Sequence, residues 1–304
     1  MQKIQIYLLA LGLIFQMPWM ANAQGVYGRP NNTILIGWDG AQRNHLKESL
    51  SRGELPNLKK LASEGALVAV DILRTTDTKA GWAQILTGYE PEKTGVFSNS
   101  RFQPIPRGYT VFERLEQFFG PNQFVTVAVI AKKGNLGADE GEPYFYSKES
   151  MDIFVNGLTD GEVVCLKTLE LLDQYKDKPF FFFVHFAEVD QMGHRYGENS
   201  REYNDALISV DRWTGKIIEK LEALDLYEKT LIYVTADHGF DENMTNHGDA
   251  PYVFLATNDP KVKRRGERVD ITPTILTRFG LDIRRTDPPL DGHTLTKPYR
   301  PLTW

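Results

Sequence analysis

Cysteine is almost absent from this chain of 304 residues, which contains only Cys165. A single cysteine cannot form a disulfide within the chain, so the folded state must be stabilised by its hydrophobic core. A chain of this size, about 280 residues without its first segment, can bury such a core as one large domain. Cys165 falls in a stretch typical of a helix, and we interpret it as a small buried hydrophobic residue.

The sequence also lacks a strongly basic region. It contains 40 acidic and 35 basic residues, which give a formal net charge of −5. The densest basic segment, KVKRRGER at residues 261–268, is interpreted as a solvated loop between strands. Nothing in this pattern indicates a groove for a nucleic-acid duplex.

The longest apolar segment lies at the N-terminus. A lysine precedes an apolar run from residue 4 to about residue 15, and residues 21–23 read Ala-Asn-Ala, the A-x-A pattern of a signal peptidase site. The run is too short to cross a bilayer. We therefore predict that residues 1–23 are a signal peptide, that residues 24–304 form one domain without a membrane anchor, and that the mature protein is periplasmic or secreted.

Strand-like and helix-like segments alternate along the rest of the chain. Short runs rich in β-branched and aromatic residues predict strands at 33–38, 66–72, 124–131, 180–186, 231–236 and 252–257. Stretches that favour helices lie near 55–64, 110–119, 159–176, 201–225 and 271–279. This alternation predicts an α/β fold with a mostly parallel central sheet sandwiched by helices.

Three of the predicted strands lead into an aspartate. The first runs directly into Asp39, the apolar run at 180–184 leads to Asp190, and the run at 231–234 leads to Asp237. Because sites in open α/β sheets form at the carboxyl edge of the strands, we expect these carboxylates to lie close together. An aspartate after a strand can also serve only as the N-cap of the next helix.

Histidine is scarce, and three of the six histidines accompany these aspartates. His194 follows Asp190 in V-D-Q-M-G-H, His238 follows Asp237 in T-A-D-H-G, and His247 lies in the next N-H-G. Such a mixture of carboxylates and imidazoles suits Zn²⁺ or Mn²⁺ and is too rich in nitrogen for Ca²⁺ or Mg²⁺ alone. Six ligands exceed the needs of one tetrahedral ion. The set therefore predicts two divalent ions, an arrangement that clamps the attacking and leaving oxygens in phosphoryl displacement.

Two histidines compete for the third imidazole position. His247 follows His238 by nine residues, so a short loop could fold it back over the predicted ion site. His293, in D-G-H-T-L, lies near the C-terminus and is the alternative.

A segment rich in hydroxyl groups lies between the first and second of these motifs. Residues 73–88 read LRTTDTKAGWAQILTG, a polar turn followed by a short segment compatible with a helix. A hydroxyl at the start of a helix lies at the positive end of the dipole, where phosphate binds favourably. A contact with a metal ion would also lower the pKa of that hydroxyl and make it a nucleophile. Thr75, Thr76 and Thr78 are the three candidates.

The order of these motifs resembles the alkaline phosphatase superfamily and, within it, the branch of type I phosphodiesterases and nucleotide pyrophosphatases. The pattern consists of Asp-Gly after the first strand, D-x-x-G-H-x-x-G at 190–197, T-A-D-H-G at 235–239 and N-H-G at 246–248, together with a threonine nine residues before the threonine of L-T-G at 86–88. The resemblance extends from residue 32 to about residue 295. It implies that residues 24–304 are one alkaline phosphatase-like catalytic domain.

The resemblance also implies the role of each site residue. The threonine nine residues before the T-G pair is the nucleophile in this family, which selects Thr78. The implied ligands of one ion are Asp39, Thr78, Asp237 and His238, and those of the other are Asp190, His194 and His247. The resemblance thus favours His247 over His293.

Asn99, in G-V-F-S-N, matches an asparagine that is implied to hold a non-bridging phosphate oxygen, although a loop asparagine that forms an Asx-turn is the alternative. The chain departs from the nucleotide pyrophosphatases after the nucleophile, where Lys79-Ala80-Gly81 replaces F-P-N. The aromatic residue that would help to stack a nucleobase is therefore absent there. We interpret Lys79 as a solvated surface lysine, with contact to an anionic substrate group as the alternative.

Together these features predict a two-metal hydrolase of small phosphate esters, with diesters as the first expected substrates, Thr78 forming a phosphothreonine intermediate, and Zn²⁺ or else Mn²⁺ as the ions. The first alternative is a phosphomonoesterase, phosphonate hydrolase or sulfatase-like hydrolase of the same superfamily. The alternative of another class is a non-catalytic, metal-stabilised binding protein, for which a missing ligand would be the sign. No ligand of the implied set is missing.

Overall fold

The computed structural model describes residues 30–134, 151–250 and 252–296, so the predicted signal peptide lies outside the described residues. The described strands form one sheet of eight, in the order β4-β3-β5-β1-β6-β7-β2-β8. Their bounds are β1 Asn32–Trp38, β2 Ala66–Asp71, β3 Val125–Ile130, β4 Ile153–Asn156, β5 Phe180–Phe186, β6 Thr230–Thr235, β7 Tyr252–Thr257 and β8 Gly266–Glu267. Among them β7 alone is antiparallel to its neighbours, which confirms the predicted mostly parallel sheet.

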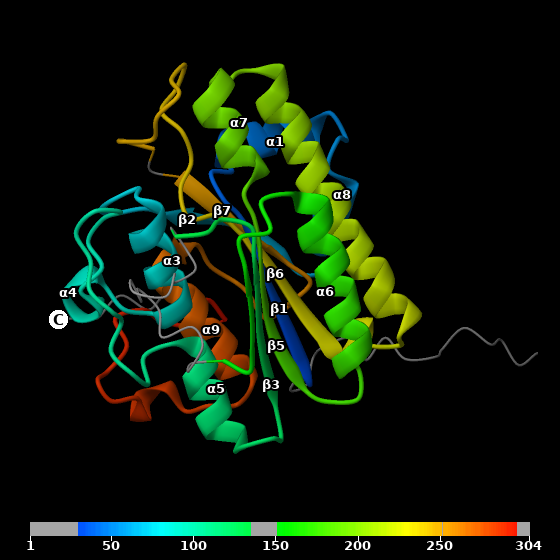
Figure 1. Ribbon diagram of the computed structural model, residues 1–304, viewed down its shortest axis with the longest axis vertical. Helices are drawn as coiled ribbons and strands as arrows, with labels where there is room; N and C mark the ends of the chain where they lie inside the picture. The colour runs from blue at the N-terminus through cyan, green and yellow to red at the C-terminus, as the bar shows by residue number, and fades with distance from the viewer. Residues whose placement is uncertain (1–29, 135–150, 251, 297–304) are drawn as a thin grey trace, which may run out of the picture.

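Helices cover both faces of this sheet. Their bounds are α1 Arg43–Ser51, α2 Pro56–Glu64, α3 Thr78–Thr87, α4 Pro91–Thr94, α5 Val111–Phe119, α6 Gly161–Tyr175, α7 Glu188–Tyr196, α8 Arg201–Ala223 and α9 Ile271–Arg278. In Figure 1, α6 and α8 lie on one side of the sheet and α3, α5 and α9 on the other. No helix in the described part of the chain is long and apolar enough to cross a membrane.

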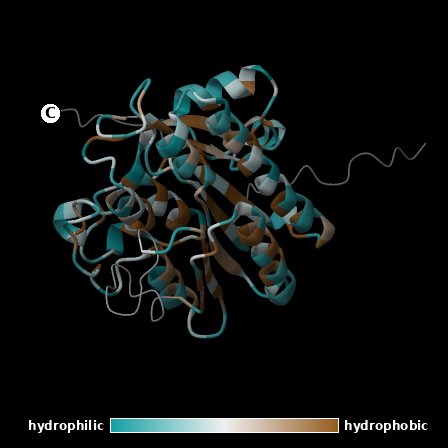
Figure 2. Cartoon of the chain, turned by 45° about the horizontal axis from the view of Figure 1, so that its top comes forward, coloured by the Kyte–Doolittle hydropathy of each residue, from teal (hydrophilic) through white to brown (hydrophobic). Residues whose placement is uncertain are grey.

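The central strands are apolar because they are buried on both faces. Every residue of β1, β3, β5 and β6 is buried, and β5 reads FFFFVHF. Strands of a parallel sheet covered by helices give such continuous apolar runs rather than alternation. Figure 2 shows the same distribution, with hydrophobic residues concentrated in the sheet and on the inner sides of the helices.

Five of these helices and strands are not predicted from the sequence: α1, α4, α7, β4 and β8. The helix α1 reads RNHLKESLS and buries only Leu46 and Ser49, so it lacks the broad apolar stripe that marks an amphipathic helix. The strand β4 has four half-buried residues and lies at the edge of the sheet beside β3. These omissions leave the predicted mostly parallel central sheet unchanged.

Candidate functional site

The carboxyl edge of the sheet brings the three predicted aspartates together. The strands β5, β1 and β6 are neighbours in register and end at the same level. Asp39 follows β1 directly, Asp237 follows β6 by two residues, and Asp190 lies in the first turn of α7, just after β5. All three are buried.

His238 lies at the centre of these carboxylates. Its Nε2 is 3.4 Å from Asp39 Oδ1, 3.5 Å from Asp190 Oδ1 and 3.5 Å from Asp237 Oδ2. Its Nδ1 is 2.9 Å from the carbonyl oxygen of Gly239. In the neutral ring the proton therefore belongs on Nδ1, and the lone pair of Nε2 is directed toward the carboxylates.

The three carboxylate oxygens near His238 are buried and accept no hydrogen bond within the described residues; they are Asp39 Oδ1, Asp190 Oδ1 and Asp237 Oδ2. Leaving several anionic oxygens in this state is costly unless a cation compensates their charge. Carboxylate oxygens and imidazole nitrogens are the ligands that Zn²⁺ and Mn²⁺ accept. The residues that are present therefore fit a divalent ion.

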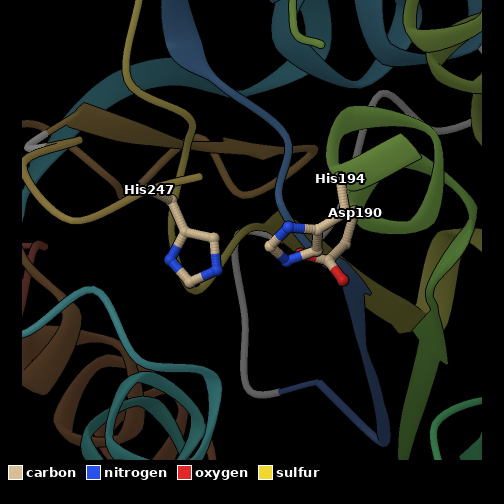
Figure 3. A group of neighbouring side chains, drawn as sticks. All are labelled: Asp190, His194 and His247. Atoms are coloured by element: carbon tan, nitrogen blue, oxygen red, sulfur yellow. The ribbon is translucent and has the colours of Figure 1, made fainter. Parts of the chain in front are cut away.

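A second group of potential ligands adjoins the first. Asp190, His194 and His247 place one ligand atom each within 4.8 Å of one another, and Figure 3 shows the His247 ring turned toward the two residues on α7. His194 Nε2 is 3.3 Å from Asp190 Oδ1, and its Nδ1 donates to the carbonyl oxygen of Thr245 at 2.8 Å. The lone pair of Nε2 is thus free for an ion, and Asp190 Oδ1 lies between His194 and His238.

The loop after β6 holds His247 over this edge. Asp241 accepts hydrogen bonds from the backbone nitrogens of Gly248 at 2.9 Å and Asp249 at 2.8 Å, which closes the loop around His247. The His247 ring stacks on His238 with centroids 3.8 Å apart. This loop therefore brings the predicted histidine to both ligand groups.

His293 lies outside both ligand groups. Its side chain is exposed, and its backbone nitrogen donates to Asp270 Oδ1 at 2.7 Å. The structure thus places His247, and not His293, beside the aspartates.

Thr78 is the first residue of α3 and is 2% exposed. Its Oγ1 is 3.3 Å from His238 Nε2, which places the hydroxyl against the ligand group. Thr75 is engaged elsewhere, because its hydroxyl donates to Asp77 Oδ2 at 2.8 Å within the preceding turn. Of these two hydroxyls, only that of Thr78 contacts a member of the ligand groups.

Asn99 lies against the first turn of α3. Its Oδ1 accepts from the backbone nitrogen of Lys79 at 2.9 Å, and the Lys79 ammonium donates to the Asn99 carbonyl oxygen at 3.1 Å. The ammonium also lies 3.6 Å from the centre of the Phe102 ring. Lys79 is only 7% exposed, so the interpretation as a solvated surface lysine is wrong. The segment from Asn99 to Phe102 folds over the side chain and shields it from water.

Two polar residues at this edge are missed by the sequence analysis. Lys132, two residues after β3, places its Nζ 3.2 Å from Asp39 Oδ2 and 2.5 Å from Asp190 Oδ2. His185, within β5, places its Nε2 2.9 Å from Asp39 Oδ2. Both contact the Oδ2 atoms and leave the Oδ1 atoms of the two aspartates facing the histidines. The rule that selected the aspartates, a polar residue just after a parallel strand, also selects Lys132.

Arg268 corrects the interpretation of residues 261–268 as a solvated loop. It begins the 3₁₀ helix η2 (Arg268–Asp270) and is 2% exposed. Its guanidinium donates to the carbonyl oxygens of Asp237 and Thr75. A run of basic residues does not reveal which one turns inward.

The crowded charges shift the pKa values of the ligand residues. Burial and the neighbouring Asp39 raise the pKa of Asp237 to about 7. Burial opposes the charged form of His238, but the carboxylates, Asp237 foremost, outweigh it and raise the pKa to about 9. Burial and the nearby His238 lower the pKa of His247 to about 4. His247 is therefore neutral near pH 7, which is the form that binds metal ions.

Comparison with known proteins identifies the family of this chain. The family model of type I phosphodiesterase / nucleotide pyrophosphatase matches residues 33–280. Human ectonucleotide pyrophosphatase/phosphodiesterase family member 1 is 26% identical over 234 residues, which are 73% of this chain and 24% of that protein. Human bis(5'-adenosyl)-triphosphatase ENPP4 is 23% identical over 222 residues, which are 70% of this chain and 48% of that protein. The chain thus spans about a quarter to a half of the length of these curated relatives.

Solved structures share the fold at low sequence identity. A protein of the alkaline phosphatase superfamily from Vibrio parahaemolyticus superposes with a TM-score of 0.63 at 18% identity, covering 91% of this chain and 72% of that chain. The alkaline phosphatase of the Antarctic bacterium TAB5 gives a TM-score of 0.59 at 15% identity, covering 84% of this chain and 99% of that chain. The chain belongs to the type I phosphodiesterase / nucleotide pyrophosphatase family and has the fold of the alkaline phosphatase superfamily.

Proposed function

We propose that this protein is a two-metal phosphoesterase that hydrolyses small phosphate diesters through a phosphothreonine intermediate. One observation carries the proposal. Three buried carboxylate oxygens that accept no hydrogen bond from the described residues surround His238 Nε2, and the Thr78 hydroxyl lies 3.3 Å from the same nitrogen. A cation-binding cluster is thus adjacent to a hydroxyl at the start of a helix, where a phosphate group would be favoured.

The two proposed ion sites share this edge of the sheet. The residues that would hold the ions are Asp39, Thr78, Asp237 and His238 for one, and Asp190, His194 and His247 for the other. When bound, the ions would act as Lewis acids that lower the pKa of the nucleophile and stabilise negative charge on the leaving oxygen. The ligand types favour Zn²⁺, with Mn²⁺ as the alternative.

The residues of the chain then have distinct tasks. Thr78 Oγ1 gives its proton to water and attacks phosphorus, the new Oγ1–P bond forms, and the bond from phosphorus to the leaving alkoxide breaks. The alkoxide takes a proton from water and leaves as the alcohol. Water subsequently hydrolyses the threonine phosphate ester and restores the hydroxyl. Asn99 uses its oxygen to accept from the Lys79 backbone, so its amide nitrogen is the group that we assign to a non-bridging phosphate oxygen.

The substrate is proposed from the family and from one departure. The relatives carry the names pyrophosphatase, phosphodiesterase and bis(5'-adenosyl)-triphosphatase, which supports a diester or a related phosphoanhydride. Lys79 stands where the nucleotide pyrophosphatases have an aromatic residue. We therefore expect weaker recognition of the nucleobase than of the phosphate group.

A panel of four chromogenic substrates tests the proposal. With Zn²⁺ or Mn²⁺ supplied, the kcat/KM for bis-p-nitrophenyl phosphate should exceed those for p-nitrophenyl phosphate, p-nitrophenyl phenylphosphonate and p-nitrophenyl sulfate. Elemental analysis should find close to two ions per chain, and chelation should abolish turnover. A preference for the monoester, phosphonate or sulfate would replace the diesterase assignment with one of these activities. Bound ions without any turnover would instead indicate a metal-stabilised binding protein.

We also propose that residues 1–23 direct export and are removed, and that residues 24–304 form the single catalytic domain of a periplasmic or secreted protein. The A-x-A pattern at residues 21–23 supports cleavage before Gln24. Mass spectrometry of the protein isolated from its native host should find this N-terminus. An N-terminus at Met1 in the exported fraction would contradict the proposal.

A further inference from the structure

One buried side chain connects the segment before the nucleophile to the end of β6. Arg268 Nη1 donates to the carbonyl oxygen of Asp237 at 2.7 Å, and its Nη2 donates to the carbonyl oxygen of Thr75 at 2.7 Å. Thr75 lies three residues before Thr78, and Asp237 directly precedes His238. Arg268 therefore joins the segment that leads to the nucleophile with the segment that carries two of the proposed ion ligands.

The packing of α3 leaves no space for a side chain at this junction. A Cβ atom added to Gly81 would lie 2.9 Å from Arg268 Nη1 and 2.9 Å from Asp237 Cβ. Real side-chain atoms do not approach so closely, so only glycine allows α3 to pack against these two residues. The helix that begins with Thr78 thus rests directly on the guanidinium and on the proposed ligand.

Arginine is a costly choice for a purely structural contact here. A buried guanidinium loses its hydration, and two hydrogen bonds to neutral carbonyl groups compensate only part of that loss. Its planar fork, however, fixes two acceptors in one rigid geometry, which the single ammonium of lysine cannot reproduce. The two hydrogen bonds go to backbone carbonyls on different segments, so the orientation of one segment relative to the other is what the fork determines.

We propose that Arg268 is a positioning residue that sets the distance between the Thr78 hydroxyl and the ligands Asp237 and His238. The proposal rests on the proposed function, in which Thr78 is the nucleophile. Because a displacement of about 1 Å at a reacting centre can reduce the rate about 100-fold, loss of the fork should lower kcat while the ligand side chains remain.

Kinetics and ion content of Arg268→Met and Arg268→Lys test this role. With bis-p-nitrophenyl phosphate, Arg268→Met should lower kcat about 100-fold, with KM within a few-fold of the wild-type value and two ions still bound. Arg268→Lys keeps the charge without the fork and should recover only a small part of kcat. Because an unfolded fraction also lowers apparent kcat at constant KM, kcat is calculated per folded, ion-loaded chain, with the folded fraction measured by circular dichroism and the ion content by elemental analysis; a purely structural role would leave this corrected kcat at the wild-type value.

Arg278 provides a matched control. It is also buried, 5% exposed, and its Nε donates to Asp259 Oδ2 at 2.7 Å. Asp259 follows β7, the antiparallel strand, and so lies at the opposite edge of the sheet. Arg278→Met should lower the denaturation midpoint as a buried pair is broken, while the folded fraction keeps its kcat.

Gly81→Ala tests the same geometry without removing Arg268. Alanine favours a helix more than glycine does, so a decrease in kcat with both ions retained would arise from the displacement of α3. This result would support the proposal even if the Arg268 variants fail to fold.

Wild-type kcat in Gly81→Ala, or in the folded fraction of Arg268→Met, would overturn the proposal. Loss of an ion from Arg268→Met would also overturn it, because Arg268 would then act on the ion site. A wild-type protein without phosphoesterase turnover would refute the proposed function instead, and the role of Arg268 with it.

Discussion

Replacing Thr78 with alanine should reduce diester turnover to a residual rate while the protein keeps its fold and most of its bound metal. Removal of a catalytic nucleophile typically costs about 10⁴-fold to 10⁶-fold in kcat. The change is small structurally, because Thr78 is the first residue of α3 and alanine is well tolerated in helices. Three of the four proposed ligands of that ion remain, so elemental analysis should still find metal. Steady-state kinetics of the folded variant measures the loss.

The neighbouring threonines are the controls for this result. Thr75→Ala removes a hydroxyl that bonds Asp77 inside the turn, and the carbonyl that Arg268 contacts is unchanged. Both Thr75→Ala and Thr76→Ala should therefore have mild effects, and Thr78→Ser should recover part of the activity because it restores a hydroxyl. Equal loss in Thr75→Ala and Thr78→Ala would mean that the nucleophile has been assigned to the wrong residue.

The positions of the aspartates were predictable because a general rule applies to them. Parallel strands that end at one level deliver the residues that follow them to one edge, and Asp39 and Asp237 follow apolar runs that are unmistakably strands. The same rule applies to Lys132, two residues after β3, but lysine is not among the usual ligands of Zn²⁺ or Mn²⁺, so a pattern of metal ligands does not include it. The sheet order itself needed the structure, since nothing in the runs states which strand neighbours which.

Other features depend on tertiary contacts that no local pattern reveals. His185 is the single polar side chain within the apolar run of β5, and only its distance to Asp39 identifies it as a contact of the site. Arg268 belongs to a basic run whose other basic residues are more exposed than it is. Lys79 becomes buried because the segment from Asn99 to Phe102 folds over it. In each case the contacting residue is distant in sequence. Local composition therefore predicts only the environment that this residue type usually has, and not the contact that it makes here.

His247 is the residue for which the structure and the resemblance make the same choice between two candidates. Its ring lies beside His194 and stacks on His238, and its pKa is lowered to about 4 by burial and by His238. His293 is exposed and is tied to Asp270 only through its backbone nitrogen. Replacement of the His293 side chain therefore leaves that hydrogen bond in place.

We expect His247→Ala to lower the metal content by about one ion per chain and to reduce kcat by more than about 100-fold. The loss of kcat is expected to be this large because His247 is proposed to bind the ion itself. Changes to groups that merely support a ligand already lower metal affinity or activity about 10-fold to 100-fold. Asp190 and His194 would then hold that ion alone, whereas the site formed by Asp39, Asp237 and His238 keeps its ligands. His293→Ala should retain both ions and nearly all activity. Elemental analysis and kinetics of the two variants, prepared side by side, test this assignment. Loss of an ion from His293→Ala, with the ion content of His247→Ala unchanged, would mean that His293 and not His247 binds the second ion.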